Sequence, residues 1–483
     1  MNESQIKLNH DLIKKNKIKI RKLYQKSLRR FRKYWFTGCL ITRLKPRDHF
    51  WLKKNLLANF AEPSYLYGQP YVLKDNVSTK NILTTCGSAF LKKYFPPFNA
   101  TIYDLLSGVG CILVGKANMD EFAMGGTGTF SAYGVVHNPH LYDNIAGGSS
   151  SGSAVAVAID AVPFSIGNDT GDSVRKPASY VGVVGYKPSY GFISRYGILP
   201  YAPSLDHIGI FTKYVTDASI VAQTIVRYDE KDFTSVKAPI PFKDTLNYKS
   251  QLKLGYLGCL EALMPFNVYS EWKMFKKLCK EKGINLVRLS VNYDYLRSVS
   301  SVYRIISYAE AASCYASFTG LTFGQHLNGF SFDDLAVKTR TKFFGQQVKR
   351  RFIIGSFATS SQNFEKLFLK SKQVRRLIVN DYLQYLPPID SKNSPTVDAI
   401  VSLGASNVAP TIISIKSDNS GVTNLIDDYL QIANFSGMPS ITIPFTTISR
   451  LPLGLNFMAG WGRDVELLDV AYTFEKIFSA RRK

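Results

Sequence analysis

The sequence has no long apolar run: no uninterrupted stretch approaches the roughly 18 residues of a membrane-spanning helix. Its six cysteines include no C-x-x-C pair and no spacing typical of a metal finger. A chain of this length does not need disulfide bonds, so we expect reduced thiols in a reducing compartment. The only H-x-x-H pair, His137 and His140, lacks a third ligand. These absences argue against a membrane protein, a disulfide-stabilised secreted domain and a metalloenzyme.

Acidic residues are scarce, because 36 Asp and Glu face 60 Lys and Arg, and the formal net charge is +24. A surface this basic attracts polyanions. Much of the surplus lies in residues 1–54, which hold 17 Lys and Arg against three acidic residues. Two interpretations stay open: an arm that contacts RNA or directs the protein to an organelle, or a solvated helix whose lysines reflect coding bias. An RNA contact would produce a steep salt dependence without base specificity.

The pattern of apolar residues predicts an α/β protein. Residues 5–34 have a helical pattern, and from about residue 61 short apolar strands alternate with helices and glycine-rich turns. Strands return after a helical middle, which predicts one large mixed β-sheet core covered by helices on both faces. We therefore expect a basic, partly helical N-terminal extension and one catalytic domain. Their predicted bounds are 1–54 for the extension and 55–483 for the domain, with a core at 67–213, a helical middle at 250–395 and closing strands and helix at 396–483.

Three segments carry the candidate chemistry. Lys74 ends an apolar strand, where a lysine is usually solvated, but a lysine that points into the fold has a lowered pKa and can act as a base. The run GGSSSGS at 147–153 lies between apolar segments and lacks the GK[ST] ending of a nucleotide-binding P-loop. The turn at 167–177 places Ser173 where its hydroxyl would be exposed and where successive N–H groups could hold an oxyanion. The simpler interpretation of Ser173 is a helix N-cap.

Taken together, these segments resemble the amidase signature family. The family places a lysine in a K-D-N turn, a serine in a GGSS run and a nucleophilic serine after a D-x-G-G turn. Here Lys74 and Ser149 are 75 positions apart, and Ser149 and Ser173 are 24 apart, as in the family. The resemblance covers about 67–480 and is most specific in 67–213, whereas residues 1–54 lie outside it.

The resemblance implies a role for each of these residues. Ser173 would attack the amide carbonyl. Ser149, which would follow a cis peptide bond after Gly148, would pass the proton of Ser173 on to neutral Lys74, and Lys74 would act as the base. This is a nucleophile activated by a relay, with serine and lysine in place of histidine. The oxyanion would be held by backbone amides of the turn, namely Thr170, Gly171, Asp172 and Ser173.

Within the family, five segments resemble the glutamine-hydrolysing component of glutamyl-tRNA(Gln) amidotransferases: 115–125, 185–191, 194–197, 204–209 and 347–351. That resemblance implies that Arg351 binds the carboxylate of free glutamine and that Tyr303 lines the pocket. An acid matching Asp427, or its neighbour Asp428, would bind the α-amino group. It further implies amidotransferase subunits B and C as partners, Glu-tRNA(Gln) as the acceptor within the complex, and ATP and Mg at the partner subunit, with no cofactor or metal bound by this chain.

The sequence departs from the family at several points. Asp172 replaces a glycine before the nucleophile, and its carboxylate would oppose an oxyanion unless it points away or pairs with Lys176 or Arg175. Ser151 replaces a glycine in the first loop, and the loop at 404–410 lacks the usual Pro and Thr residues. Two alternatives therefore accompany the glutaminase: a stand-alone amidase for another small amide, and an inactive RNA-binding scaffold. We expect a bacterial cytoplasmic protein, with the mitochondrial matrix as the alternative.

Overall fold

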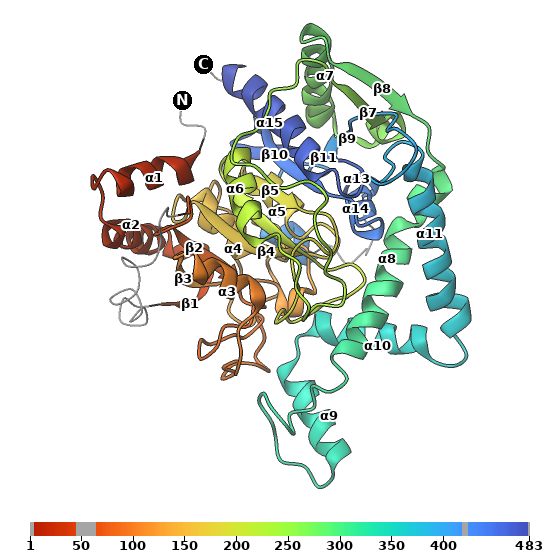
Figure 1. The fold of residues 1–483 in the computed structure, drawn as a ribbon. Helices are drawn as coiled ribbons and strands as arrows, with labels where there is room; N and C mark the ends of the chain where they lie inside the picture. The colour runs from red at the N-terminus through yellow and green to blue at the C-terminus, as the bar shows by residue number, and fades with distance from the viewer. Residues whose placement is uncertain (1–3, 45–63, 418–423, 482–483) are drawn as a thin grey trace.

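A computed structural model describes residues 4–44, 64–417 and 424–481, without the side chains of residues 416 and 417. Its core is an 11-stranded sheet in the order β1-β3-β2-β4-β6-β5-β10-β11-β9-β7-β8 (Figure 1). The strands are β1 (Leu40–Arg43), β2 (Pro70–Lys74), β3 (Ile112–Ala117), β4 (Phe164–Asp169), β5 (Val184–Lys187), β6 (His207–Thr212), β7 (Lys253–Leu257), β8 (Asn285–Leu289), β9 (Ala399–Leu403), β10 (Ser440–Ile448) and β11 (Leu451–Met458).

The sheet is mixed, and near its centre a strand from the first half of the chain pairs with a strand from near the C-terminus. Strands β3, β2 and β4 run parallel, as do β9, β7 and β8, while the strands between these groups pair antiparallel. Strand β5 from the first half of the chain pairs with β10 from the last fifty residues. The predicted single large mixed sheet with helices on its faces is confirmed.

Helices cover the sheet on both faces. They are α1 (Gln5–Lys14), α2 (Ile20–Lys33), α3 (Thr101–Gly108), α4 (Ser151–Ala158), α5 (Arg175–Val181), α6 (Val215–Ile225), α7 (Phe266–Glu281), α8 (Tyr293–Cys314), α9 (Phe332–Phe343), α10 (Gln346–Thr359), α11 (Lys370–Leu383), α12 (Ile412–Ser417), α13 (Leu425–Tyr429), α14 (Ile432–Phe435) and α15 (Asp464–Arg481). Short 3₁₀ turns lie at Trp35–Thr37, Glu121–Ala123 and Gly258–Leu263, and a π-helix at Phe364–Leu369 precedes α11. Within the described residues, no helix is long and apolar enough to cross a membrane.

The small-residue helix α4 packs under the site. Its sequence, SGSAVAVA, is buried at every position except the last, and it contacts β2, β3 and β4. Small side chains let its backbone come close to its neighbours: a Cβ at Gly152 would lie 2.2 Å from the Cys39 carbonyl oxygen. The Gly/Ser run therefore begins a buried helix and is not a flexible linker.

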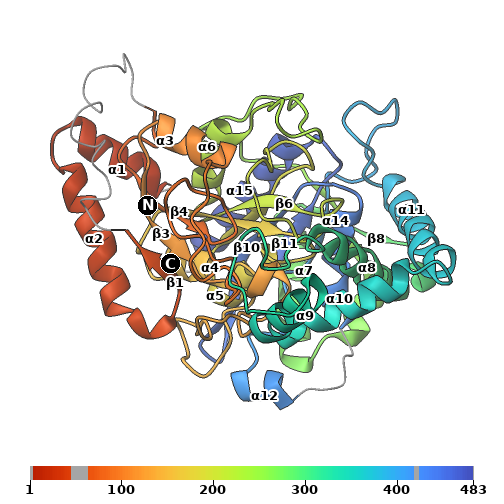
Figure 2. The same ribbon diagram turned by 90° about the horizontal axis from the view of Figure 1, so that it is seen from below.

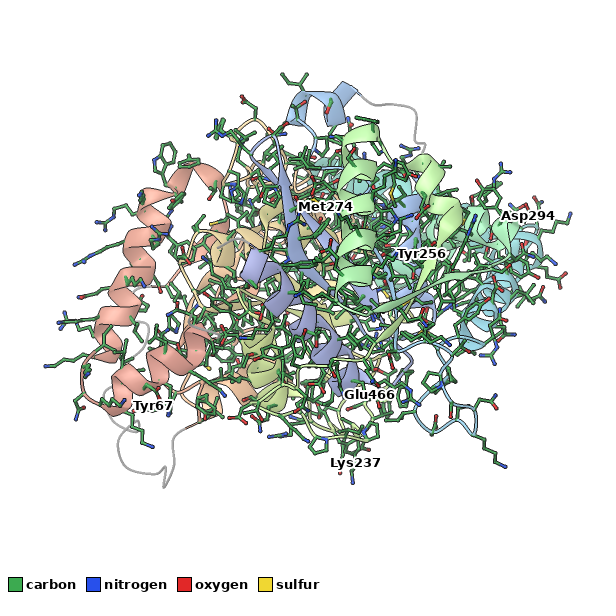
Figure 3. All side chains as sticks on the ribbon, turned by 90° about the horizontal axis from the view of Figure 1, so that it is seen from above. Tyr67, Lys237, Tyr256, Met274, Asp294 and Glu466 are labelled. Carbon is green, nitrogen blue, oxygen red and sulfur yellow. The ribbon has the colours of Figure 1, made fainter. Side chains whose placement is uncertain are left out.

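The described part of the N-terminal extension, residues 4–44, is mostly helical and packs at the edge of the sheet. Helix α2 buries Leu23, Tyr24 and Phe31, and its outward face carries lysines and arginines, whose nitrogen-tipped side chains project at one edge of Figure 3. Strand β1 pairs with β3, so the extension also adds a strand that the sequence pattern did not predict. The predicted boundary at residues 54 and 55 lies outside the described residues. Both interpretations of the cationic face remain predictions.

The helical middle also contains structure that its pattern hid. Strands β7 and β8 lie within 250–395 and close the far edge of the sheet. Helices α8, α10 and α11 lie together at the side of the molecule opposite α1 and α2 (Figures 1 and 2). Helices α8 and α10 approach closely because position 355 is glycine: a Cβ there would lie 2.0 Å from the Tyr308 carbonyl oxygen.

Candidate active site

Lys74 is the buried centre of the site. It ends β2, has 0% exposure, and its Nζ lies 2.7 Å from Ser149 Oγ while also donating to the Asn168 side-chain oxygen. Burial without a paired carboxylate disfavours the ammonium form and lowers the pKa of Lys74 to about 7. The interpretation of Lys74 as a solvated strand end is therefore wrong, and a neutral amine is available near neutral pH.

Ser149 is held by a tightly packed loop. The Gly148–Ser149 peptide bond is cis, and Gly147 has a φ of +77°. A Cβ at Gly148 would lie 2.2 Å from an Asp120 carboxylate oxygen, so only glycine fits. That carboxylate accepts hydrogen bonds from the N–H groups of residues 127, 128 and 130, which fixes it against the loop. The loop therefore presents the Ser149 hydroxyl to Lys74.

The turn that carries Ser173 meets the Ser149 loop. The Ser150 N–H donates to the Ser173 carbonyl oxygen at 3.3 Å, and the Ser150 hydroxyl donates to the Asn168 carbonyl oxygen at 2.9 Å. Ser173 is buried, with 4% exposure. Helix α5 begins after Val174 without a side-chain cap, so the N-cap interpretation of Ser173 is wrong. Lys74, Ser149 and the Ser173 turn thus lie together.

The backbone of the turn offers unused donors. The N–H groups of Gly171, Asp172 and Ser173 donate no hydrogen bond to any residue that the structure describes. Gly171 lies under the Tyr303 ring, since a Cβ there would be 2.9 Å from the ring carbon that bears the hydroxyl. Three adjacent N–H groups that are free to donate suit a developing oxyanion.

A buried ion pair that sequence reasoning missed shapes the turn. Arg175 is fully buried and pairs with Asp169 at 2.8 Å. Its guanidinium also donates to the Gly171 carbonyl oxygen at 2.6 Å and to the Asn434 side chain at 2.7 Å. Burial alone would raise the pKa of Asp169, but the charge and hydrogen bonds of Arg175 outweigh it and hold that pKa well below the usual range. Arg175 therefore does not neutralise Asp172.

We expect Asp169→Asn to lower the free energy of unfolding by about 3–5 kcal/mol, because it leaves a buried guanidinium without its counter-charge. The low folded-state pKa of Asp169 means that the pair stabilises the protein above the unfolded-state pKa of about 4 and loses this contribution as pH falls below it. Urea unfolding of both proteins across pH measures the difference. Asp160→Asn, at a carboxylate that is 45% exposed beside Arg30, is the control and should change stability by less than about 1 kcal/mol. An equally small loss for Asp169→Asn would contradict the assignment.

Asp172 pairs with Lys176, one of the two cations predicted for it. The Lys176 Nζ lies 3.7 Å from the Asp172 carboxylate and 2.8 Å from that of Asp427. Burial, with the nearby charges of Asp169 and Asp427, raises the pKa of Asp172 to about 7 although Lys176 opposes the rise. The carboxyl next to the nucleophile is therefore partly protonated near neutral pH.

The predicted substrate-binding residues lie around this turn. Arg351, on the face of α10 that also carries Gly355, stacks on the rings of Tyr201 and Tyr308 at 5.8 and 5.3 Å. Its Nε and Nη1 are buried without a hydrogen-bond partner among the described residues. Tyr303 packs on the turn itself. A guanidinium held by aromatic rings with two unused nitrogens can bind a carboxylate.

Asp427, not Asp428, faces the open side of the site. Asp428 has only 2% exposure, whereas Asp427 lines a cavity of about 420 Å³ together with Lys176 and the loop at 406–411. The backbone N–H of Ser406 donates to Asp427 at 2.7 Å. The loop that departs from the family sequence thus fixes the predicted acidic residue.

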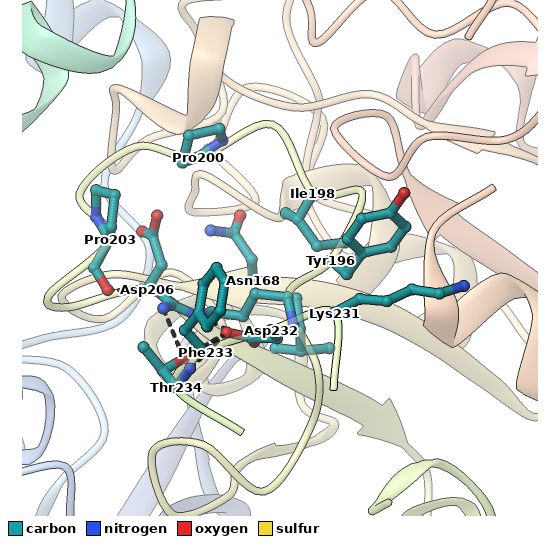
Figure 4. A pocket seen from close by; sticks show the side chains of 12 residues that line it. Asn168, Tyr196, Ile198, Pro200, Pro203, Asp206, Lys231, Asp232, Phe233 and Thr234 are labelled. Carbon is teal, nitrogen blue, oxygen red and sulfur yellow. Dashed lines mark hydrogen bonds and ion pairs between the residues drawn. The ribbon is translucent and has the colours of Figure 1, made fainter. Parts of the chain in front are cut away.

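A second cavity, of about 300 Å³, lies behind Asn168 (Figure 4). Asn168 has 1% exposure, and its side chain reaches both this cavity and Lys74. The buried carboxylate of Asp206 lies on the same wall and accepts from the Thr170 hydroxyl at 2.5 Å. Asn168 is a contact of Lys74 that sequence reasoning missed, although it lies inside the predicted turn segment.

Comparison with known proteins agrees with this geometry. The family model described as Amidase matches residues 41–468. The A subunit of glutamyl-tRNA(Gln) amidotransferase from Mycoplasma genitalium is 48% identical over 85% of this chain and 86% of its own. The same-named protein from Thermoanaerobacter pseudethanolicus is 38% identical over 86% and 84%. The crystal structure of the same-named protein from Thermotoga maritima matches with a TM-score of 0.77 at 30% identity, over 94% of this chain and 91% of that one.

Proposed function

Because the chain belongs to the amidase family, we propose that it is the glutamine-hydrolysing subunit of an amidotransferase that converts Glu-tRNA(Gln) to Gln-tRNA(Gln). The observation that carries the chemistry is the buried 2.7 Å contact between Lys74 Nζ and Ser149 Oγ beside the Ser173 turn. The names of the relatives support the choice of glutamyl-tRNA(Gln) as the acceptor.

The proposed reaction uses three side chains and one turn. Ser173 Oγ attacks the carboxamide carbon while its proton passes through Ser149 to neutral Lys74. The N–H groups of the turn stabilise the oxyanion. Lys74 then returns the proton through Ser149 to the leaving nitrogen, the C–N bond of the tetrahedral intermediate breaks, and ammonia departs, which leaves a glutamyl ester on Ser173. Water, activated by the same relay, hydrolyses the ester to glutamate.

The proposed binding site holds both charged groups on the α-carbon of glutamine. Arg351 receives the α-carboxylate, Tyr303 covers the side chain, and the acidic end of the pocket, to which Asp427 belongs, receives the α-ammonium group. We propose that subunits B and C complete the complex and that ATP and Mg act at the partner subunit on Glu-tRNA(Gln). Relatives from bacteria support a place in the bacterial cytoplasm.

We expect the purified chain with its partner subunits to release ammonia from glutamine, and Arg351→Met to raise the KM for glutamine by about tenfold to hundredfold. Methionine keeps the packing on Tyr201 and Tyr308 but removes the charged hydrogen bonds to the carboxylate. The rate of ammonia release, measured against glutamine concentration, gives kcat and KM for each protein.

The neighbouring exposed cation provides the matched control, since Arg350→Met should leave the KM near that of the wild type. An unchanged KM in Arg351→Met would contradict glutamine binding by Arg351. Wild-type hydrolysis of other small amides but not of glutamine would favour the stand-alone amidase. No hydrolysis of any amide, with partners present, would favour the inactive scaffold.

A further inference from the structure

Two carboxylates share one lysine at the acidic end of the proposed glutamine site. Lys176 lies 2.8 Å from Asp427 and 3.7 Å from Asp172, and the three side chains are between 16% and 19% exposed. Two negative charges and one positive charge leave this group at −1 when Asp172 is ionised. The question is which carboxylate remains available for the α-ammonium group of a substrate.

Asp427 is already occupied by donors of its own chain. Its Oδ1 accepts from the Ser406 N–H at 2.7 Å, and its Oδ2 accepts from Lys176 at 2.8 Å and from the Ser406 hydroxyl at 3.2 Å. Lys176 lies nearer to this carboxylate, at 2.8 Å, than to that of Asp172, at 3.7 Å, so like-charge repulsion opposes a second ammonium more strongly at Asp427.

Asp172 is the less occupied carboxylate. It accepts no side-chain hydrogen bond from the part of the chain that the structure describes, and its only ion pair there is the longer one to Lys176. It directly precedes Ser173, and the adjacent Gly171 contacts Tyr303. The pKa of the Tyr303 hydroxyl is raised mainly by burial; the negative charge of Asp172 adds to that rise and the positive charge of Arg351 opposes it, so both charges act on this side chain.

From these contacts we infer that Asp172 is the residue that receives the α-ammonium group of the substrate, while Lys176 keeps Asp427 paired. This inference rests on the proposed glutaminase function and names the residue that selects an α-amino acid amide. Arg351 and Asp172 would then hold the carboxylate and the ammonium on one carbon of the substrate.

The arrangement also explains how a carboxylate can stand beside the nucleophile. An ionised Asp172 opposes the oxyanion formed at the turn. A bound α-ammonium group brings the local sum to two negative and two positive charges, so the opposition is removed when the correct substrate is present. An amide without the ammonium leaves the charge of Asp172 uncompensated. Asp172 therefore disfavours hydrolysis of such amides and favours hydrolysis of glutamine. Specificity is often achieved by combining repulsion of the wrong ligand with attraction of the right one.

The test compares glutamine with glutaramic acid, the same amide without the α-amino group. The complex with its partner subunits is assayed at about pH 8, where Asp172, with a pKa of about 7, is mostly ionised. We expect Asp172→Asn to lower kcat/KM for glutamine and to raise it for glutaramic acid. The ratio of the two constants should fall about tenfold to hundredfold, as expected when a charged hydrogen bond is lost.

Lys176→Met separates this role from a structural one. Without the lysine, Asp427 is free to receive the ammonium, so Asp172→Asn should change the ratio much less in the Lys176→Met background than alone. A double-mutant cycle on the ratio, with thermal unfolding of each protein, measures this coupling. Equal losses on both substrates in Asp172→Asn, which leave the ratio unchanged, would mean that Asp172 only shapes the turn. Wild-type constants for both substrates would mean that Asp427 binds the ammonium. Either result overturns the inference.

The two levels of the proposal fail differently. If the wild-type complex does not hydrolyse glutamine, the proposed function fails before any variant is compared. If it hydrolyses glutamine and the Asp172→Asn ratio does not fall, the glutaminase stands and only the assignment of Asp172 fails.

Discussion

Ser173→Ala is expected to reduce glutamine hydrolysis by a factor of about 10⁴ or more, because Ser173 is the only serine of the turn at 167–177 and loss of a nucleophilic serine removes the covalent path. The side chain is small and makes no hydrogen bond to a described residue, so folding should be unaffected. Ammonia release by the complex measures the loss. Acid quenching followed by mass spectrometry should find a glutamyl ester at Ser173 in the wild type and none in the variant.

Ser151→Ala is the matched control for this experiment. Ser151 lies in the same serine-rich run and is buried, but its hydroxyl has no hydrogen-bond partner among the described residues. We expect activity close to that of the wild type. Retained glutaminase activity in Ser173→Ala would show that another group attacks the amide, and an adduct on a different serine would identify it.

The proposed catalytic residues could be identified from the sequence because their motifs and spacing resemble those of the amidase signature family, although each segment alone is ambiguous. Lys74 ends the buried strand β2, Ser149 lies in the loop before α4, and Ser173 lies in the turn after β4. The strands that hold them are also locally encoded, since Val-, Ile- and Leu-rich runs that are buried on both faces predict strands without knowledge of their partners.

The supports of the site were not predictable, because their partners are distant in sequence. Asn434 donates to Asp169 from 265 positions away, and Asp427 reaches Lys176 from 251 positions away. Neither contact leaves a pattern around either residue. Strands β7 and β8 are short and partly exposed at the sheet edge, and β7 pairs with β9, which follows some 140 residues later. Tertiary pairing therefore decides their conformation more than local propensity does.

Asp172 shows where sequence and structure complement each other. The sequence identifies it as a departure and predicts that a cation must accompany it. The structure assigns the cation, because Arg175 is committed to Asp169 and, among the described residues, only Lys176 reaches the carboxyl. The substitution is thus one part of a charge arrangement that includes Asp427.

Lys74→Met is expected to lower kcat/KM for glutamine by a factor of about 10³ or more, because it removes the proton acceptor behind Ser149 and general-base catalysis typically contributes about 10²–10⁴. Methionine retains the length and apolar stem of the buried side chain. The loss should lie in kcat more than in KM, since Lys74 contacts Ser149 and Asn168.

The pH profile provides the second and sharper readout for Lys74. Burial lowers the pKa of Lys74 to about 7, so the neutral base predominates above that pH and is protonated below it. We therefore expect kcat/KM of the wild type to fall as pH decreases through about 7. Asp172 titrates in the same range. Its protonation also lowers kcat/KM for glutamine, because it removes the partner of the α-ammonium group, but raises kcat/KM for an amide without that group.

Two variants show which titrating group causes the fall of kcat/KM as pH decreases through about 7. Asp172→Asn should retain it if Lys74 is responsible. Lys187→Met should also retain it, because Lys187 is an equally buried lysine that donates to the Met438 carbonyl oxygen away from Ser149. A fall that disappears in Asp172→Asn, or a Lys74→Met enzyme that keeps wild-type kcat, would mean that the 2.7 Å contact between Lys74 and Ser149 holds the loop without carrying the proton.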